Sequence, residues 1–279
     1  MYTREYPEAS KEHWSRVAPL FSAIKPPLKP REEDLDYVRD IVRNQINGSE
    51  SLRVAILGVT REYYDLPWPE GTDLIAIDRS QAMIDHVWPG PPETVRRCDW
   101  RDLCLSDKAR NFAITDGGLS MLPYPLDLEA VVNHLARILE PGGIFLARLY
   151  APHKDREPID QIVDDLKDGK IANMSEFKIR MWMTVQETPE KGMAVHDVWN
   201  EFTARVPDLS GLCTALGWSE SEAATLERYR ESNDRYYHPT KNDVVRVFTS
   251  NPGTFEFLSA IEPSYSVGRF CPTVVFRRV

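Results

Sequence analysis

The sequence predicts an α/β fold built on a doubly wound, mostly parallel sheet of seven strands. Between residues 51 and 150, short apolar runs alternate with helical patterns, and turn residues bound each run. The runs are apolar at consecutive positions rather than at every second position. Strands that are apolar on both faces are typical of parallel sheets covered by helices on both sides.

The strands are expected where these apolar runs occur. Their predicted ranges are 54–59, 73–78, 94–99, 111–116, 144–149, 223–230 and 273–278. After the second strand, Ser80 is placed to cap a short helix at 81–87. Residues 127–139 carry apolar side chains at spacings of three and four, so a longer helix is expected before the fifth strand.

The N-terminal segment, residues 1–50, is expected to be helical. Apolar residues recur at helical spacing from 14 to 24 and again within 33–47, and prolines separate the two runs. The segment precedes the main domain, residues 51–279. We interpret it as a helical lid over the binding site.

A second segment, residues 151–210, interrupts the strand–helix rhythm after the fifth strand. It is charge-rich, with a helix expected at 155–170 and a strand at 181–185. A short helix is expected at 209–216, ending at Gly217. We interpret this segment as an insertion on the substrate side of the sheet.

Composition limits the partners of the chain. The 279 residues include 34 Lys and Arg against 43 Asp and Glu, for a net charge of −9, and no basic run occurs. Such a chain is poorly suited to phosphate backbones or anionic membranes, so we expect neither nucleic acid nor membrane as a partner. No apolar run approaches the ~20 residues of a membrane span, and residues 1–6 lack a signal-peptide pattern. We therefore expect a cytoplasmic protein.

The four cysteines give no sign of a metal site. Cys98, Cys104, Cys213 and Cys271 form no CxxC pair and have no histidine at ligand spacing. We expect reduced thiols and no metal.

The strongest functional signal is a glycine followed by an acid. Gly58 follows the first strand, and Asp78 ends the next strand twenty residues later. Ligands of open parallel sheets bind beyond the carboxyl ends of the strands, where a carboxylate can accept hydrogen bonds from a ribose diol. This spacing predicts a nucleoside-containing cofactor. The alternative is a turn glycine and a solvent-facing aspartate.

The first loop favours one cofactor over another. A dinucleotide site needs G-x-G-x-x-G, because the pyrophosphate contacts bare amides at a helix N-terminus. Here Thr60 and Tyr63 occupy the second and third glycine positions, and Pro67 shortens any helix. S-adenosylmethionine carries no phosphate, so the loop favours it over NAD.

Five segments together resemble class I S-adenosylmethionine-dependent methyltransferases, which have a Rossmann-like fold. The segments are 54–58, 76–83, 98–100, 114–118 and 139–143. The family usually has Gly-x-Gly in the first loop, whereas Val59-Thr60 follows the glycine here. The chain looks like a less common subgroup with a Gly-Val-Thr turn.

The resemblance implies an adenosine site. Asp78 would hold the ribose hydroxyls, while Arg79 and Met83 would flank the adenine. Asp99 would bind the adenine amino group, with Trp100 beside the ring. Asp99 could instead cap the following segment, Trp100 could cover the sheet edge, and Met83 could fill the core.

The resemblance also implies where the methyl donor's other end lies. Gly58 would lie under the methionine portion, and Val59-Thr60 would follow it, with the Thr60 hydroxyl as a further contact. Asp116 and Gly117 would lie near the transferred methyl group.

The acceptor side has fewer signals. His13 and Trp14 open the N-terminal helix, where Trp14 would face the sulfonium and His13 could take a proton. Arg148 at the end of the fifth strand and His153 just beyond are the other catalytic candidates. The alternatives are a helix that simply packs and a surface ion pair.

These expectations predict methyl transfer from S-adenosylmethionine to a small molecule, with the acceptor atom undetermined. One alternative is a nucleoside-binding protein without transferase activity, acting as a regulator. Another is an NADP-dependent reductase that uses Arg79 for the 2′-phosphate, and a third is other chemistry with the same cofactor. The oligomeric state is not predicted.

Overall fold

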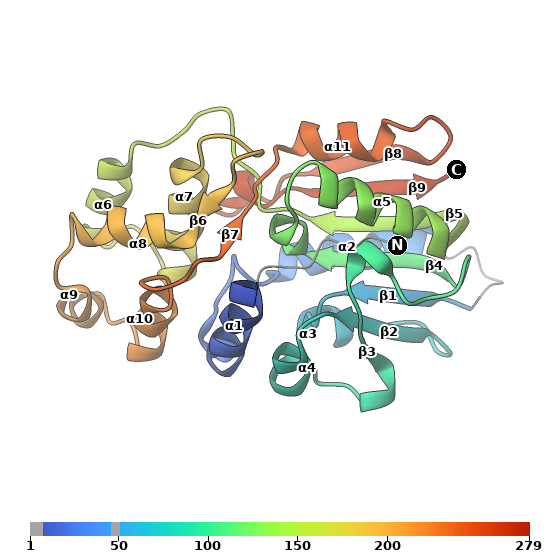
Figure 1. The fold of residues 1–279 in the computed structure, drawn as a ribbon, viewed down its shortest axis with the longest axis horizontal. Helices are drawn as coiled ribbons and strands as arrows, with labels where there is room; N and C mark the ends of the chain where they lie inside the picture. Colours follow the sequence, from blue (N-terminus) through green and yellow to red (C-terminus); the bar gives the residue numbers. More distant parts are fainter. Residues whose placement is uncertain (1–7, 46–50) are drawn as a thin grey trace.

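The computed structural model describes residues 8–45 and 51–279, and a seven-stranded sheet forms its centre (Figure 1). The strand order is β3-β2-β1-β4-β5-β9-β8. β1 to β5 are parallel, and β9 is antiparallel to both of its neighbours. The strands are β1 (Arg53–Leu57), β2 (Asp73–Asp78), β3 (Val95–Arg97), β4 (Arg110–Asp116), β5 (Leu139–Arg148), β8 (Phe255–Ile261) and β9 (Thr273–Arg278). The predicted doubly wound, mostly parallel sheet is confirmed.

Helices cover both faces of the sheet because the strands are apolar on both faces. Val54 and Ile56 of β1 pack with α2 (Glu32–Gln45) on one side. Ala55 and Leu57 lie in the cluster on the other side, with α5 (Leu126–Ile138) and α11 (Lys241–Thr249). This alternation fixes the register of β1 between two cores.

A helical region lies between β5 and α11, beside the carboxyl ends of the parallel strands (Figure 1). Its helices are α6 (Ile159–Lys167), α7 (Met174–Val185), α8 (Val195–Thr203), α9 (Leu209–Ala215) and α10 (Glu220–Glu227), and a small ribbon pairs β6 (Met193–Ala194) with β7 (Arg235–Tyr236). The region therefore extends past the predicted boundary at residue 210. It has its own apolar core, which includes Phe177 and Phe202.

Two strand predictions in this region are wrong. Residues 181–185 end the helix α7, and residues 223–230 lie mostly in α10. Residues 174 to 183 are all buried, so α7 lacks the polar face that marks a surface helix. The sheet's sixth strand in chain order is instead β8, an edge strand whose exposed side chains hide the apolar pattern.

The N-terminal helices separate into two groups. The helix α1 (Glu8–Val17) and the 3-10 helix η1 (Ala18–Ala23) lie near α4 (Gln81–Val87), and η1 also contacts α10. In contrast, α2 packs on a face of the sheet. The last positions of the helical pattern predicted within 33–47, and residues 1–6, lie outside the described residues.

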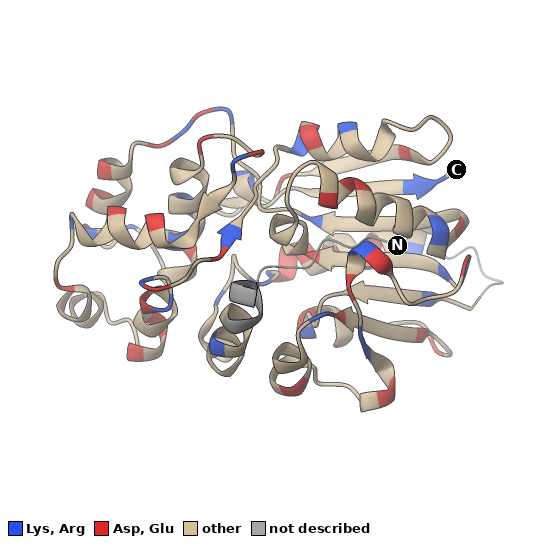
Figure 2. Cartoon of the chain, viewed as in Figure 1, with Lys and Arg blue, Asp and Glu red and all other residues tan. Residues whose placement is uncertain are grey.

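The remaining described elements are short. They are α3 (Arg61–Tyr64), η2 (Pro92–Thr94), η3 (Trp100–Asp102), η4 (Gly118–Met121) and η5 (Gly268–Phe270). Among the described helices, none combines the length and apolar character needed to cross a bilayer. Acidic and basic residues are interspersed over the fold (Figure 2).

Candidate active site

A cavity lies at the carboxyl ends of β1, β2 and β4, where the strand order reverses between β1 and β4. One wall consists of the loops that follow these strands. The opposite walls come from α1 and η1, from α7, and from α10 with the residues after it. Such a crevice is the usual ligand site of a doubly wound sheet.

All eleven residues predicted to bind the cofactor line this one cavity. They are Trp14, Gly58, Val59, Thr60, Asp78, Arg79, Met83, Asp99, Trp100, Asp116 and Gly117. They come from several separate elements, so their meeting is a property of the fold. Their binding roles stay predictions.

Asp78 presents a carboxylate to the cavity from the end of β2. Its Oδ1 accepts a hydrogen bond from the Ser80 N–H at 2.8 Å, and Ser80 in turn caps α4. Burial raises the pKa of Asp78 to about 6, although the backbone N–H groups of Ser80 and Arg79 and the Arg79 charge act in the opposite direction. The carboxylate thus has too few donors for its charge, which suits a ligand that supplies two hydroxyl groups.

The first loop is shaped by a glycine and a tryptophan. Gly58 has φ +103°, a conformation that side chains disfavour, and its N–H donates to Ile77 O at 2.8 Å. The Trp100 Nε1–H donates to the same carbonyl at 2.8 Å. A Cβ at Gly118 would overlap the Trp100 ring. The indole is therefore fixed against the backbone of the cavity wall.

Asp99 has the capping role that the alternative interpretation describes. Its side chain accepts from the Arg101 N–H at 2.9 Å and caps η3. The Arg101 guanidinium also donates to both carboxylate oxygens, at 3.1 and 2.8 Å. Burial opposes ionisation, but these hydrogen bonds lower the pKa of Asp99. Asp99 is thus a fixed anion that also lines the cavity.

Arg148 does not line the cavity, and its catalytic role stays a prediction. Its side chain is fully buried, and its Nε donates to Asp116 Oδ1 at 2.6 Å. Both terminal nitrogens donate to Pro27 O at 2.9 Å. Arg148 therefore orients Asp116 from behind and ties the N-terminal segment to the sheet.

His153 is also outside the cavity, and its catalytic role likewise stays a prediction. Its side chain is 28% exposed, and Nδ1 lies 3.5 Å from Asp155 Oδ2. The chain turns away from the strand ends after Tyr150, whose ring does line the cavity. Tyr150 packs so closely on Gly117 that a Cβ there would overlap its ring.

His13 does line the cavity, in a buried chain of polar side chains. Its Nδ1 lies 3.0 Å from Asp234 Oδ2, and its Nε2 lies 2.9 Å from the Tyr236 hydroxyl. Burial raises the pKa of Tyr236 well above its usual value, so this phenol keeps its proton. The Tyr236 O–H can then donate to Nε2 while Nδ1–H donates to Asp234.

Sequence inspection missed the helical wall of the cavity. Its residues are Lys178, Trp182, Thr225, Arg228 and Tyr229, together with Tyr236 from β7. The signals for these helices are their caps, because Asn173 accepts from the Glu176 N–H, and Ser219 with Glu222 forms a capping box. These N-x-x-E and S-x-x-E patterns mark the starts of α7 and α10.

The described part of the chain contains no group of three or more His, Cys, Asp or Glu residues able to hold a metal ion. All four cysteines, including the exposed Cys104 and the buried Cys271, are free thiols.

Comparison with known proteins gives information on the fold alone. No family model matches the chain, and no curated protein matches it. Solved structures do match. The N-methyltransferase NodS from Bradyrhizobium japonicum, in complex with S-adenosyl-L-homocysteine, has a TM-score of 0.51 at 9% identity, covering 96% of this chain and 98% of that one. A S-adenosylmethionine-dependent methyltransferase from Methanosarcina mazei has a TM-score of 0.50 at 13% identity, covering 86% and 97%.

These matches show that the chain has the fold of class I S-adenosylmethionine-dependent methyltransferases. A chain from Rhodobacter sphaeroides, named as a Zn-dependent alcohol dehydrogenase, has a TM-score of 0.63 at 15% identity, covering 98% of this chain and 100% of that one. At such identities the likeness establishes the architecture and no activity.

Proposed function

We propose that this protein transfers a methyl group from S-adenosylmethionine to a small-molecule acceptor inside the cavity. The observation that carries this proposal is the convergence of the eleven predicted cofactor residues on one cavity, in a methyltransferase fold. The helical wall of the cavity, formed by α7 and α10, faces the loops that follow the strands and leaves room for an acceptor. The Gly58-Val59-Thr60 turn marks, in this proposal, a subgroup of the family.

The cavity wall suits this cofactor at three points. The underpartnered Asp78 carboxylate would accept the ribose hydroxyls, and Gly58 would let the methionine portion approach the backbone. The Trp100 indole, fixed against Gly118, would lie beside the adenine. The bound cofactor would supply a methyl group already activated by its sulfonium.

The chain itself would align the acceptor and remove its proton where the acceptor needs it. An acceptor hydroxyl or ammonium would donate to the Tyr236 oxygen, and the Tyr236 proton would pass to His13 Nε2. Asp234 would stabilise the resulting imidazolium across its 3.0 Å contact. The lid proposed for the N-terminal segment would consist of α1 and η1, and it would exclude water.

A reductase is the second candidate, because one structural neighbour is named as an alcohol dehydrogenase. The first loop argues against a dinucleotide here. It leads into α3, a helix of only four residues, which offers no extended N-terminus for a pyrophosphate. A nucleoside-binding protein without transferase activity remains the third candidate.

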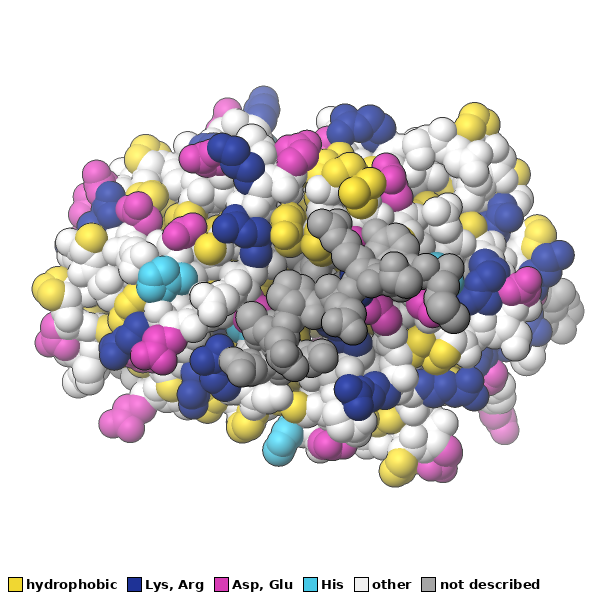
Figure 3. Space-filling view, in the orientation of Figure 1, with side chains coloured by type: hydrophobic (Ala, Val, Ile, Leu, Met, Phe, Trp, Pro, Cys, Tyr) yellow, Lys and Arg dark blue, Asp and Glu magenta, His cyan; other side chains and the backbone are white. Residues whose placement is uncertain are grey.

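Partners and location are also part of the proposal. We propose a cytoplasmic enzyme that binds neither nucleic acid nor membrane. The face shown in Figure 3 carries side chains of both charges in mixed order. A surface with no dominant basic area gives little electrostatic attraction to phosphate.

Calorimetric titration tests the cofactor. S-adenosylhomocysteine and S-adenosylmethionine should bind with micromolar affinity, and NADPH should not bind. The opposite order would replace the methyltransferase by a reductase. A labelled-methyl assay against a pool of metabolites then separates an enzyme from a cofactor-binding protein, since only an enzyme moves the label to an acceptor.

A further inference from the structure

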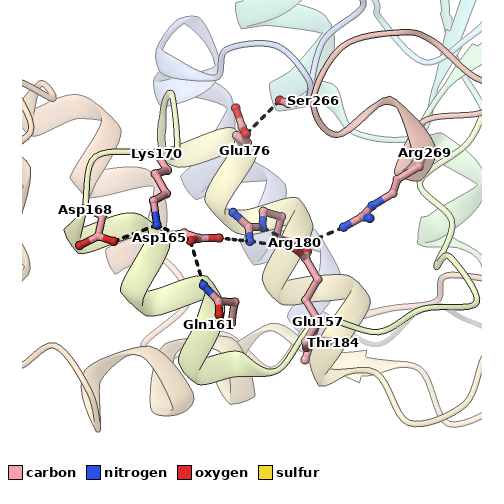
Figure 4. Close-up of polar contacts among 10 residues, drawn as sticks. All are labelled: Glu157, Gln161, Asp165, Asp168, Lys170, Glu176, Arg180, Thr184, Ser266 and Arg269. Atoms are coloured by element: carbon pink, nitrogen blue, oxygen red, sulfur yellow. Dashed lines mark hydrogen bonds and ion pairs between the residues drawn. The ribbon is translucent and has the colours of Figure 1, made fainter.

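The helix α7 carries three charged residues, of which two are paired. Glu176 accepts from the Ser266 hydroxyl at 3.1 Å, and Arg180 pairs with Glu157 at 2.8 Å and Asp165 at 2.7 Å (Figure 4). Successive residues of a helix are turned by about 100°. Lys178 therefore points about 200° away from both Glu176 and Arg180, toward the cavity that it lines.

Lys178 is a buried amine without a counter-charge. It is 3% exposed, its Nζ donates to Thr225 Oγ1 at 3.1 Å, and it lies 5.7 Å from the centre of the Tyr229 ring. No carboxylate of the described residues pairs with it, and desolvation lowers its pKa to about 7. A buried ammonium is unfavourable unless an anion accompanies it.

Three charged groups on elements packed against α7 have ion-pair partners other than Lys178. Asp165 of α6 pairs with Arg180, and Glu222 of α10 pairs with Lys25 at 2.8 Å. Arg269 of η5 lies 3.2 Å from Glu157. On the cavity side, the neighbours of Lys178 are the neutral Thr225 and Tyr229.

A second cation lies at the rim of the same wall. Arg228 follows Thr225 by three residues, so both lie on one face of α10. It is exposed, lines the cavity, and forms no ion pair with the described residues. Arg230, two residues on, differs because it pairs with Glu227 at 2.8 Å and stacks over Trp199.

The two walls therefore differ in charge. The cofactor wall carries three carboxylates and one cation, Asp78, Asp99, Asp116 and Arg79, while the charged residues of the helical wall are the cations Lys178 and Arg228. Apolar side chains from η1 and η4, such as Phe21 and Met121, also line the cavity. One buried cation in apolar surroundings matches one negative charge, as on a carboxylate, better than the two charges of a phosphate.

We propose that the methyl acceptor is a small organic acid whose carboxylate pairs with Lys178, and that Arg228 attracts it at the entrance. This inference rests on the proposed function, because it concerns the acceptor side of the same cavity. It also predicts proton uptake. Near pH 8 the free amine is mostly neutral, and pairing with a carboxylate raises its pKa, so the complex gains up to about one proton.

Titrations with matched probes test the proposal. A panel of aromatic and aliphatic hydroxy and amino acids, each with its neutral primary amide, is titrated with and without S-adenosylhomocysteine. At least one acid should bind ten-fold or more tightly than its amide. Lys178→Met should abolish that preference and leave the affinity for S-adenosylhomocysteine unchanged. Arg228→Gln should reduce it about three-fold, and the matched control Arg230→Gln should leave it intact.

Calorimetry in two buffers with different ionisation enthalpies measures the linked proton. At pH 8, binding of the acid to wild-type protein should be accompanied by the uptake of close to one proton by the complex. Binding to Lys178→Met should be accompanied by none. If Lys178→Met does not fold, the comparison of Arg228→Gln with Arg230→Gln still tests whether the cavity prefers an acid, because both side chains are on the surface and their replacement should not affect folding.

Three results would overturn the inference. They are an amide that binds as well as its acid across the whole panel, equal effects of Arg228→Gln and Arg230→Gln, and loss of S-adenosylhomocysteine binding in Lys178→Met. The last result would assign the lysine to the cofactor's own carboxylate. Failure of the proposed function is distinct: wild-type protein would not bind S-adenosylhomocysteine, while a Lys178-dependent preference for acids would still support the anion site.

Discussion

At the scale of single residues, Asp78 shows how a binding group is kept at a cost to stability. Its folded pKa of about 6 lies above the value of 3.8 for a free side chain. The folded state thus favours the protonated acid, and this contribution to stability is present below about pH 4 and lost as the pH rises through 6. At neutral pH the ionised carboxylate destabilises the protein until a ligand supplies donors.

Asp78→Asn separates binding from stability. The amide keeps an oxygen for the Ser80 N–H but loses the charge that would hold two hydroxyl groups. We expect affinity for S-adenosylhomocysteine to fall 10- to 100-fold, and the free energy of unfolding at pH 7 to rise by about 1–3 kcal/mol. Calorimetry and chemical denaturation measure the two effects.

The exposed Glu70→Gln is the control for loss of one negative charge, and both quantities should remain unchanged. In wild-type protein, affinity should also decline as the pH falls through 6, as the Asp78 carboxylate becomes protonated. Undiminished affinity in Asp78→Asn would remove this residue from the cofactor site.

The residues of the cofactor wall could be predicted because they follow strands whose positions are local properties of the sequence. Gly58, Asp78 and Asp116 each lie at or just after the end of an apolar run, and the parallel arrangement brings those ends together. Lys178 could not be predicted in this way. Its significance depends on Glu176 and Arg180 finding partners on other elements, which no local pattern contains.

At the scale of elements, α7 and α10 show where periodicity fails. A helix buried on nearly all sides has no polar face, so α7 resembled a strand over 181–185. The edge strand β8 was not predicted for the opposite reason, because its side chains are mostly exposed and give no apolar run. Capping residues are independent of burial, and Asn173 and Ser219 mark the starts of both helices.

The α1–η1 segment offers a test of the proposed lid. It contributes His13, Trp14 and Phe21 to the cavity and contacts both α4 and α10. Deletion of residues 1–24 should speed the dissociation of S-adenosylhomocysteine at least ten-fold and reduce turnover, because the cavity would open to water. Stopped-flow fluorescence measures the dissociation rate.

Deletion of residues 1–7 alone is the matched control, because it leaves α1 and η1 in place. Its dissociation rate should equal that of the wild type. Equal rates in both deletions would show that the segment packs on the cavity without closing it.

At the scale of the whole molecule, Arg148 joins parts of the chain that are far apart in sequence. It connects β5 to Asp116 at the end of β4 and to Pro27, which follows η1. Burial raises the pKa of Asp116 even though the Arg148 charge opposes this. Removal of Arg148 would leave a buried carboxylate without its cation.

Arg148→Met should therefore lower the free energy of unfolding by about 3–5 kcal/mol. The double variant Arg148→Met, Asp116→Asn should recover part of this loss, because Asp116 no longer carries a charge. The recovery should be incomplete, because the buried Asp34, 3.8 Å from Arg148 Nη1, still loses its cation. Denaturation curves of the wild type, the two single variants Arg148→Met and Asp116→Asn, and the double variant give the coupling free energy. If Arg148→Met were as stable as the wild type and only its turnover were reduced, the result would support the predicted catalytic role of Arg148.

The strand β9 lies between β5 and β8, although it follows both in the chain. During synthesis on the ribosome, β5 therefore keeps one open, apolar edge until Thr273–Arg278 has emerged. An open edge of this kind can pair with another chain and start aggregation. Premature termination only a few codons before this strand would thus yield an association-prone fragment, even though every cavity-lining residue had already been translated.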